Sequence, residues 1–418
     1  ILFNFMNDKK KYIAIVTSFG LIHSGMFHHH RILFKKLSNN FEKIFVINSQ
    51  NLRFFPKLAK NINMEKNDNE FVEPENIPKN FFFFNPKNSN EFSKFLEDKE
   101  LIIINNFTKH FFDLKVQFLL KKHKIKQIQV SNLGTIGFGI KTSSKHLIKS
   151  LIFHFNQTFF NKFTVFLTNL GLVSKLEIRF FSNLRDIKNM KKSFFKRFLY
   201  NKKLLWAKEI KLINSRTYDI FLENKFPISE DYIVHLDANL NHRHELELRG
   251  VWDEEKTKQH YYYLEKFLKK LSNEFKKEVL ITIHPAYDLE EHQKYFKDFK
   301  VLKYKTSECI YKSFMVTSFD SGAITDAILL KKKIIGLQSN FMSINEIEHS
   351  KIYPQNVGYL HLNTKDDYSF NKNELLEEMN NNIKNYDKFI SNYHCFKPNI
   401  SGSDEIVQTI KERFFDVK

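Results

Sequence analysis

Short apolar runs recur along the chain, each ending in polar or small residues and followed by a longer stretch of helical character. In the first half, the runs that predict strands are Tyr12–Val16, Ile44–Ile47, Leu101–Ile104 and Ile125–Val130, with Phe81–Phe84 as a weaker fifth. Parallel strands need crossover connections, which are usually helices. The alternation therefore predicts a parallel sheet wrapped by helices.

A second series of the same kind begins near Ile210. Its predicted strands are Ile210–Asn214, Tyr232–Leu236, Val279–Ile283, Phe299–Leu302, Phe314–Thr317 and Ile334–Leu337, with helices at 254–276, 287–298, 322–330 and 372–389. A chain of 418 residues is long enough for two domains. We therefore expect an α/β protein with two Rossmann-like domains facing a central cleft, the arrangement called GT-B. The domains span 1–200 and 210–390, and a C-terminal helix over 391–418 could cross back to the first.

Two strand ends of the second series carry the most informative chemistry. The strand Val279–Ile283 ends in His284-Pro285, and the strand Phe314–Thr317 runs into a turn rich in Ser and Gly before a helix. Such a turn offers backbone N–H groups at the carboxyl edge of a sheet, where phosphates commonly bind. We predict that the phosphate-binding residues are His284, Pro285, Thr317, Ser318, Ser321 and Gly322.

These residues also have plainer interpretations. A strand-end histidine can be structural, and Ser, Thr and Asp are ordinary helix caps. The order of the two motifs within one strand–helix–strand unit favours the anion site, where His284 would donate a hydrogen bond or a proton to a leaving phosphate. Helix ends and basic side chains can hold a phosphate without a metal, so we expect no cofactor and no requirement for Mg²⁺.

A dense polar turn follows the strand Tyr232–Leu236. Asp237 stands at its carboxyl end, where a carboxylate could act as general base or hold an acceptor, with His242 and His244 as possible assistants. Clustered histidines can also bind a metal, but no Cys and no repeated carboxylate spacing accompany them. We therefore predict no metal site.

The first half offers candidates for the acceptor side. The loop Thr17–Gly25 contains glycines but not the dinucleotide-binding pattern of three spaced glycines. The acceptor-side candidates in this loop and in the turn after the strand Ile125–Val130 are Ser18, Gly20, His23, Asn132 and Gly134. His28 is a further candidate for the base, although a run of three histidines can equally be a surface feature.

Charge adds a preference for anionic partners. The chain has 66 Lys and Arg against 47 Asp and Glu, a net charge of +19, and the segment 141–211 holds sixteen of the basic residues and only three acidic ones. We predict that this segment forms basic, apolar-faced helices that are either solvated or docked on an anionic membrane surface. No nucleic-acid-binding module accompanies the charge, so we expect no nucleic-acid partner.

Two further observations bear on location. The two cysteines, Cys309 and Cys395, fit neither a disulfide framework nor a zinc site. No run of about 18 apolar residues predicts a membrane-spanning helix. We expect a cytoplasmic protein, peripheral on the inner membrane if the basic segment docks there.

The motifs over 210–365 resemble a known family. His284-Pro285, the turn Thr306–Glu308, and the turn Ser318–Gly322 with Asp326–Leu329 resemble bacterial surface-polysaccharide glycosyltransferases of GT-B fold, including sialyltransferases and polysialyltransferases that use CMP-sugars. A related pattern occurs in CDP-glycerol glycerophosphotransferases. The resemblance implies that His284 and Ser321 contact the CMP phosphate. It also implies a carboxylate or histidine base in the first half, where we find no Asp or Glu at a strand end.

The sequence thus predicts a glycosyltransferase whose N-terminal domain binds the acceptor and whose C-terminal domain binds a nucleotide-sugar, with CMP-linked sugars favoured. The acceptor would be a surface glycan or glycolipid in capsule, O-antigen or lipooligosaccharide synthesis. Two alternatives remain open at this point. One is a non-catalytic glycan- or membrane-binding protein of the same fold, and the other is a UDP-sugar epimerase.

Overall fold

The structure is a computed structural model of the chain. It describes residues 10–17, 24–53, 77–105, 113–131, 167, 170–183, 207–224, 226–237, 253–284, 288–342, 344–366, 368 and 371–416, with the backbone alone at 24–29 and 344–345. The described residues fall into two compact units. Unit 1 comprises those up to 219 together with 396–416, and unit 2 comprises those from 220 to 395.

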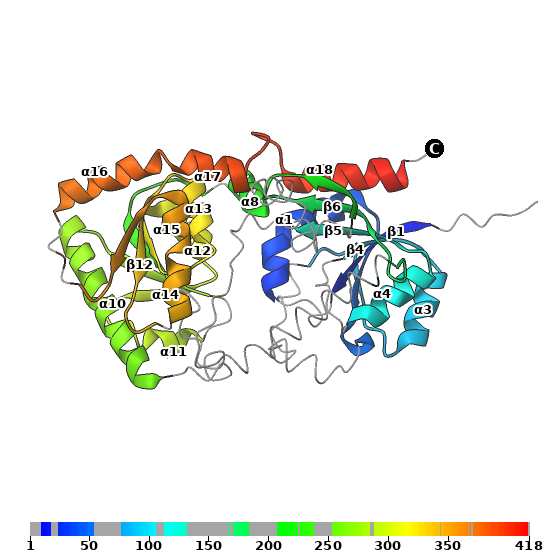
Figure 1. Cartoon of the computed structure of the whole chain (residues 1–418), viewed down its shortest axis with the longest axis horizontal. Helices are drawn as coiled ribbons and strands as arrows, with labels where there is room; N and C mark the ends of the chain where they lie inside the picture. The colour runs from blue at the N-terminus through cyan, green and yellow to red at the C-terminus, as the bar shows by residue number, and fades with distance from the viewer. Residues whose placement is uncertain are drawn as a thin grey trace, which may run out of the picture. The chain divides into compact units, whose positions relative to one another are not determined.

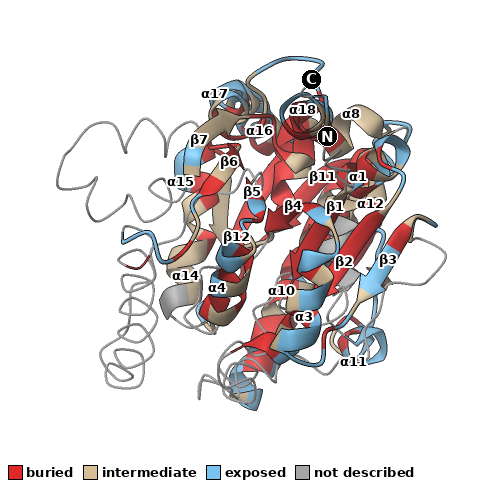
Figure 2. Cartoon of the chain, turned by 90° about the vertical axis from the view of Figure 1, so that its right-hand side faces the viewer, coloured by how far each residue is buried: buried red, intermediate tan, exposed pale blue. Residues whose placement is uncertain are grey.

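Unit 1 is built on a seven-stranded parallel sheet in the order β3-β2-β1-β4-β5-β6-β7. Its strands are β1 (Lys11–Thr17), β2 (Ile44–Asn48), β3 (Phe81–Phe84), β4 (Glu100–Asn105), β5 (Lys126–Ser131), β6 (Leu176–Phe181) and β7 (Ala207–Leu212). Figure 2 shows the central strands as buried and part of the edge strand β3 as exposed. The apolar runs form strands because helices cover both of their faces.

The two faces of this sheet carry different helices. Helices α1 (Ser24–Asn40) and α18 (Gly402–Ile410) pack on one face, in a core that includes Ile13, Ile102 and Ile406. Helices α3 (Ser89–Glu97) and α4 (Leu114–Lys122) pack on the other. The 3₁₀ turn η1 (Gln50–Leu52) follows β2, and the π-helical turn η6 (Lys411–Phe415) extends α18.

Unit 2 is built on a six-stranded parallel sheet in the order β10-β9-β8-β11-β12-β13, of which Figure 1 labels strand β12. Its strands are β8 (Tyr232–Leu236), β9 (Val279–Ile283), β10 (Lys300–Lys303), β11 (Ser313–Ser318), β12 (Lys333–Gln338) and β13 (Leu360–Asn363). In register, Leu236 of β8 lies opposite Thr282 of β9 and Ser318 of β11. The carboxyl ends of these three strands are therefore level.

Helices cover both faces of this sheet as well. Helices α10 (Glu254–Phe275) and α16 (Lys372–Ile383) pack on one face. Helices α12 (Thr306–Lys312), α13 (Ile324–Leu329), α15 (Ile352–Val357) and α17 (Tyr386–Tyr393) pack on the other. The remaining helices are α8 (Arg216–Glu223), α11 (Leu289–Gln293) and α14 (Ile344–Ser350).

The structure corrects several sequence predictions. The strand predicted to open the second series at Ile210 is β7, which pairs with β6 at the edge of the first sheet. The basic segment was predicted to be helical, yet 176–181 and 207–212 within or at the end of it are strands. Apolar residues alternate with charged ones in these strands, and that alternation can be mistaken for a helical stripe over so short a run.

Other differences concern element boundaries. The helix predicted over 372–389 is two helices, α16 and α17, and the helix predicted over 287–298 is only Leu289–Gln293. The turn at Thr306–Glu308 is the first turn of α12. Strand β13 was not predicted, because His361 and Asn363 interrupt its apolar pattern.

The segment after 395 belongs to unit 1 and is anchored there by two polar side chains. The Asn214 amide oxygen accepts from the backbone N–H groups of Phe396 and Lys397, and its amide nitrogen donates to the carbonyls of Lys397 and Ile400. The Asp219 carboxylate accepts from the backbone N–H groups of Gly402 (2.6 Å) and Ser403 (2.9 Å). Asp219 thus caps the N-terminus of α18 from another helix.

Candidate functional site

The strand order of unit 2 defines the place where a ligand is expected. β8 and β11 are neighbours in the sheet although β9 and β10 lie between them in the sequence. The connections after β8 and β11 therefore leave the sheet in opposite directions and open a crevice at the carboxyl ends of the strands. Three predicted site residues follow strands at this edge: Asp237 after β8, His284 after β9 and Ser318 at the end of β11.

His284 is exposed at the carboxyl end of β9. The strand before it is fully buried from Val279 to Ile283, so the backbone that carries the imidazole is held in the core. Pro285 lies outside the described residues. A histidine on such a rigid base can contact a ligand without a large entropic cost for its backbone.

The predicted Ser/Gly turn (residues 318–322) divides into an inner and an outer part. Thr317 and Ser318 are buried, and the Ser318 hydroxyl accepts a hydrogen bond from the backbone N–H of Ser321 at 3.3 Å. Ser321 is half-buried, and its own hydroxyl accepts from the N–H of Ala323. Ser318 therefore builds the turn, whereas Ser321 and Gly322 form the part that a ligand can reach.

Gly322 is exposed and faces open space. A Cβ atom placed on it would have no heavy atom within 4 Å, and its φ angle is not in the left-handed region. The fold itself therefore does not require glycine at this position. A ligand that approaches the backbone closely would require it, because a side chain would occupy the same space.

Asp237 is not a surface group, since its side chain is only 2% exposed. Its carboxylate accepts a hydrogen bond from the Tyr261 hydroxyl at 3.3 Å, and the Nε2 atom of His292 lies 3.5 Å from it. The Nε2 atom of His235 lies 3.9 Å from its other oxygen. Asp237 is thus the centre of a buried polar cluster that links β8 with α10 and α11.

The cluster continues to β11 and ends behind the Ser/Gly turn. His235 Nδ1 and Thr317 Oγ1 share a hydrogen bond of 2.9 Å across neighbouring strands. His260 of α10 is also buried, with its ring 4.9 Å from that of Phe319 in the turn. Burial lowers the pKa of His260 to about 4, an effect that the nearby Asp237 carboxylate opposes only in part.

Four members of this cluster, His235, His260, Tyr261 and His292, were not singled out from the sequence. A signal was available for two of them, because His260 and Tyr261 fall on the apolar face of a long amphipathic helix. A polar ring at such a position needs a buried partner. His292 carried no such signal, because its helix has only five residues.

The acceptor-side candidates Ser18, Gly20, His23, Asn132 and Gly134 lie outside the described residues, as do His242 and His244. His28 lies in α1, but its side chain is not described. At the same edge of unit 1 the structure describes Arg179 of β6, a member of the basic segment that is buried rather than solvated. Its guanidinium donates to the Ser131 hydroxyl at 3.0 Å, and burial lowers its pKa to about 10.

Within the described ranges, no group of three or more His, Cys, Asp or Glu side chains is arranged to hold a metal ion. Among the helices that the structure describes, none is both long and apolar enough to cross a membrane.

The two parallel α/β sheets, each with the strand order of a Rossmann-like domain, fit the GT-B fold that the sequence predicts. The wall teichoic acid polymerase TagF, in a form soaked with CDPG, is similar over 96% of this chain and 88% of its own, with 12% identity and a TM-score of 0.50. A putative UDP-N-acetylglucosamine 2-epimerase from Listeria monocytogenes is similar over 98% of both chains, with 12% identity and a TM-score of 0.48. MurG from Acinetobacter baumannii is similar over 96% of this chain and 100% of its own, with 8% identity and a TM-score of 0.43.

No protein-family model matches the chain, and no curated protein matches it in sequence. The likeness to TagF at 12% identity is a likeness of fold alone.

Proposed function

We propose that this protein is a glycosyltransferase that uses a nucleotide-sugar donor, and that unit 2 binds the donor phosphate. One observation carries the proposal. His284 and the Ser321–Gly322 part of the turn reach the surface at the carboxyl ends of β9 and β11, on either side of β8, where the topology switches. An imidazole and an open backbone at such an edge suit a phosphate.

The proposed reaction is a direct displacement at the anomeric carbon of the donor sugar. The acceptor hydroxyl oxygen forms the new bond to this carbon, and the bond from the carbon to the donor phosphate oxygen breaks with its electron pair going to that oxygen. A base takes the acceptor proton. His284 stabilises the charge that develops on the leaving phosphate, by a hydrogen bond or by donating a proton.

We propose that the inner and outer parts of the Ser/Gly turn have different roles. Ser321 and Gly322 contact the leaving phosphate, while Thr317 and Ser318 hold the turn in shape from inside. Preorganised donors of this kind stabilise developing charge without rearranging during the reaction. On this proposal a metal ion is not required, because His284 and the turn supply the compensating groups.

Two residues are candidates for the base. Asp237 was one candidate, and its burial favours a supporting role in which the carboxylate orients the histidines around it. His28 is the other candidate, and we propose it as the first residue of unit 1 to test.

For the donor, we propose a CMP-linked sugar, on the strength of the His-Pro and Ser/Gly motifs. TagF has been soaked with CDPG, and CDP belongs in the same test as CMP. For the acceptor, we propose a surface glycan or glycolipid of capsule, O-antigen or lipooligosaccharide assembly. The net charge of +19 supports an anionic acceptor or an anionic membrane surface nearby.

Thermal unfolding in the presence of CMP, CDP, UDP and GDP, each with and without Mg²⁺, tests the donor site. A nucleotide present at 100 times its Kd stabilises the native state by about 2.7 kcal/mol. We expect a cytidine nucleotide to raise Tm most, and His284→Ala and Ser321→Ala to remove the shift while unfolding near the wild-type Tm without ligand. Shifts that these variants leave intact would place the nucleotide elsewhere.

Transfer itself needs a second measurement. Incubation with the CMP-sugar and a glycan acceptor should release CMP and lengthen the acceptor, and neither should occur with His284→Ala. Nucleotide binding without transfer to any acceptor would favour the non-catalytic alternative. Conversion of a UDP-sugar to its epimer in the absence of acceptor would favour the epimerase alternative.

A further inference from the structure

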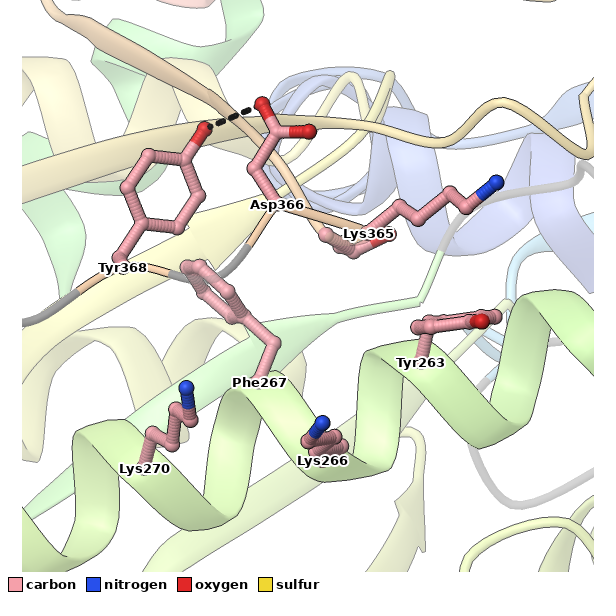
Figure 3. A pocket seen from close by; sticks show the side chains of 8 residues that line it. Tyr263, Lys266, Phe267, Lys270, Lys365, Asp366 and Tyr368 are labelled. Carbon is pink, nitrogen blue, oxygen red and sulfur yellow. Dashed lines mark hydrogen bonds between the residues drawn. The ribbon is translucent and has the colours of Figure 1, made fainter.

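A pocket in unit 2 lies between α10 and the turn after β13 (Figure 3). We call it the lysine pocket. It is lined by Tyr263, Lys266, Phe267, Lys270, Thr364, Lys365, Asp366 and Tyr368. Lys266 and Lys270 stand one turn apart on α10 and rise toward Lys365, Asp366 and Tyr368, which line the opposite wall.

The wall formed by the turn after β13 is held in place by its own hydrogen bonds. The Tyr368 hydroxyl accepts from the backbone N–H of Asn363 at 2.9 Å and donates to Asp366 Oδ2 at 3.2 Å. The backbone N–H of Thr364 donates to the carbonyl of Gln338 at 2.9 Å. The pocket is therefore preformed, which lowers the entropic cost of binding a ligand there.

Aromatic rings supply an apolar component beside the lysines. Tyr263 stacks on Phe341, with ring centroids 5.4 Å apart and planes at 15°, and the Lys365 ammonium lies 5.8 Å from the Phe341 centroid. Phe267 meets Tyr368 edge to face at 6.2 Å. An aromatic wall next to positive charge suits a ligand that has both apolar ring surface and an anionic group.

Lys266 and Lys365 of the lysine pocket differ in their charge pairing from other lysines of unit 2. Lysines outside it are commonly paired with carboxylates, as Lys312 is with Glu308 (2.8 Å) and Lys331 with Asp387 (2.9 Å). Within the part of the chain that the structure describes, Lys266 and Lys365 form no ion pair. The only acidic residue in the lining, Asp366, accepts from the Tyr368 hydroxyl.

The lysine pocket opens on the same edge of the sheet as the candidate site. β13 is parallel to β11 and two strands away from it, and the pocket is formed by residues that follow its carboxyl end. Neighbouring strands are about 4.8 Å apart, so the two strand ends are separated by about 10 Å along the sheet. A chain-like ligand of a few sugar units can span such a distance, whereas a single nucleotide held at the Ser/Gly turn need not reach the pocket.

From this placement we infer that the lysine pocket binds an anionic group, a carboxylate or a phosphodiester, of an acidic glycan. Lys266, Lys270 and Lys365 would contact the anion, and Tyr263 would contact a sugar ring. The inference rests on the proposed function in one respect, namely that the protein acts on a glycan acceptor. It adds the class of glycan: an acidic rather than a neutral chain.

Binding of three fluorescently labelled oligomers to the full chain tests the inference. The probes are an α2,8-linked sialic acid oligomer, a glycerol phosphate oligomer and a neutral maltose oligomer of similar length, measured by anisotropy. The pocket variant is Lys266→Ala/Lys270→Ala/Lys365→Ala. The control variant Lys256→Ala/Lys258→Ala/Lys388→Ala loses the same charge from exposed positions of unit 2 that do not line the pocket.

We expect at least one acidic oligomer to bind more tightly than the neutral one, with an affinity that falls as NaCl rises from about 0.05 to about 0.5 M. The pocket variant should weaken this binding roughly tenfold, the effect expected of three exposed ion pairs, and the control variant by less than about twofold. Preference between the two acidic oligomers would identify the anionic group as carboxylate or phosphodiester.

The inference is overturned if the neutral oligomer binds as well as the acidic ones, or if the pocket and control variants lose affinity equally. Nucleotide-induced thermal shifts measured on the same variants separate this result from the proposed function. If the pocket variant keeps its cytidine-nucleotide shift but the acidic oligomers do not bind, the lysine pocket fails and the donor site stands. If no nucleotide shifts Tm while acidic oligomers bind through the pocket, the proposed function fails and the pocket stands.

Discussion

His235 and Thr317 are joined by a side-chain hydrogen bond of 2.9 Å between β8 and β11, and both residues are fully buried. The bond crosses the point at which the topology of unit 2 switches, directly beneath the Ser/Gly turn. It ties the base of the candidate phosphate site to the buried cluster around Asp237. Loss of this bond should therefore lower both the stability of unit 2 and its affinity for a nucleotide.

We expect Thr317→Val to lower stability by about 1–3 kcal/mol, because a buried nitrogen of His235 loses its partner. Cytidine-nucleotide binding should weaken as well, since the turn above the bond is less well held. Urea unfolding and the thermal-shift titration measure the two effects. Thr282→Val is the matched control: its hydroxyl lies 3.5 Å from the His235 carbonyl, the limit for a hydrogen bond, so it should cost less. Equal losses in both variants would contradict a special role for the His235–Thr317 bond.

His260 predicts a pH dependence of stability. Burial lowers its pKa to about 4 in the folded protein, against 6.5 for an ordinary histidine. Between these values the unfolded chain binds the proton and the folded protein does not, so stability falls as pH is lowered from 6.5 to 4. The shift corresponds to a loss of up to about 3 kcal/mol.

Other groups titrate in the same range, so the prediction concerns a difference between variants. Burial raises the pKa of Asp219 to about 6, which makes its contribution fall as pH rises from about 4 to 6, opposite to that of His260. The groups that face His260 are Asp237, His235 and the ring of Tyr261. Urea unfolding from pH 4.5 to 7.5 should show a smaller loss on acidification for His260→Gln than for the wild type. Parallel pH profiles would contradict the assignment.

A substitution at Gly322 should affect ligand binding without affecting folding. We expect Gly322→Ala to change stability by less than about 0.5 kcal/mol, because its Cβ meets open space. It should nevertheless weaken nucleotide binding, since the added methyl group occupies the position of the ligand. In the control, Gly336→Ala, the Cβ would lie 2.9 Å from the Tyr359 ring and 3.0 Å from Pro354, so this variant should lose about 1–3 kcal/mol. Undiminished nucleotide binding by Gly322→Ala would show that the phosphate does not bind at the turn.

The junction between Asp219 and α18 predicts a large effect far from the candidate site. Asp219→Ala leaves the N–H groups of Gly402 and Ser403 without their buried acceptor, which we expect to cost about 2–4 kcal/mol. Gly402→Ala should be at least as severe, because a Cβ would lie 2.2 Å from the Asn214 carbonyl oxygen. Limited proteolysis should then cut the segment after 395 before it cuts unit 2. A wild-type digestion pattern in both variants would show that the junction contributes little.

The strands at the candidate site were predictable because they are short, mostly apolar and followed by turn residues. Val279–Ile283 was predicted with its exact bounds, and the His-Pro and Ser/Gly motifs lie at strand ends as expected. The inner and outer halves of the Ser/Gly turn could not be separated from the sequence. The separation depends on the hydrogen bond that Ser318 makes within the turn and on the one that Thr317 makes with His235 of the neighbouring strand.

The Asp237 cluster illustrates a second limit. Asp237 was predicted as a cleft-facing carboxylate because it follows a strand, and the structure places its side chain under α10 and α11 instead. Strand position fixes which edge of the sheet a residue occupies. Whether the side chain faces solvent or a covering helix depends on residues distant in sequence, here Tyr261 and His292, and no pattern around Asp237 itself indicates that they will lie against it.

The return of the chain to unit 1 after residue 395 makes unit 2 an insertion in sequence terms. The sheet of unit 1 can form as β1 to β7 emerge from the ribosome, but α18, which closes one of its faces, is synthesised only after all of unit 2. The apolar face that holds Ile13, Ile102 and Ile178 is thus not covered by α18 until about 180 further residues have been synthesised. The described residues of unit 2 all lie between 220 and 395, so this part of the chain can fold first. Cotranslational chaperone demand should therefore fall mainly on unit 1, although it is the unit whose first strands are made earliest.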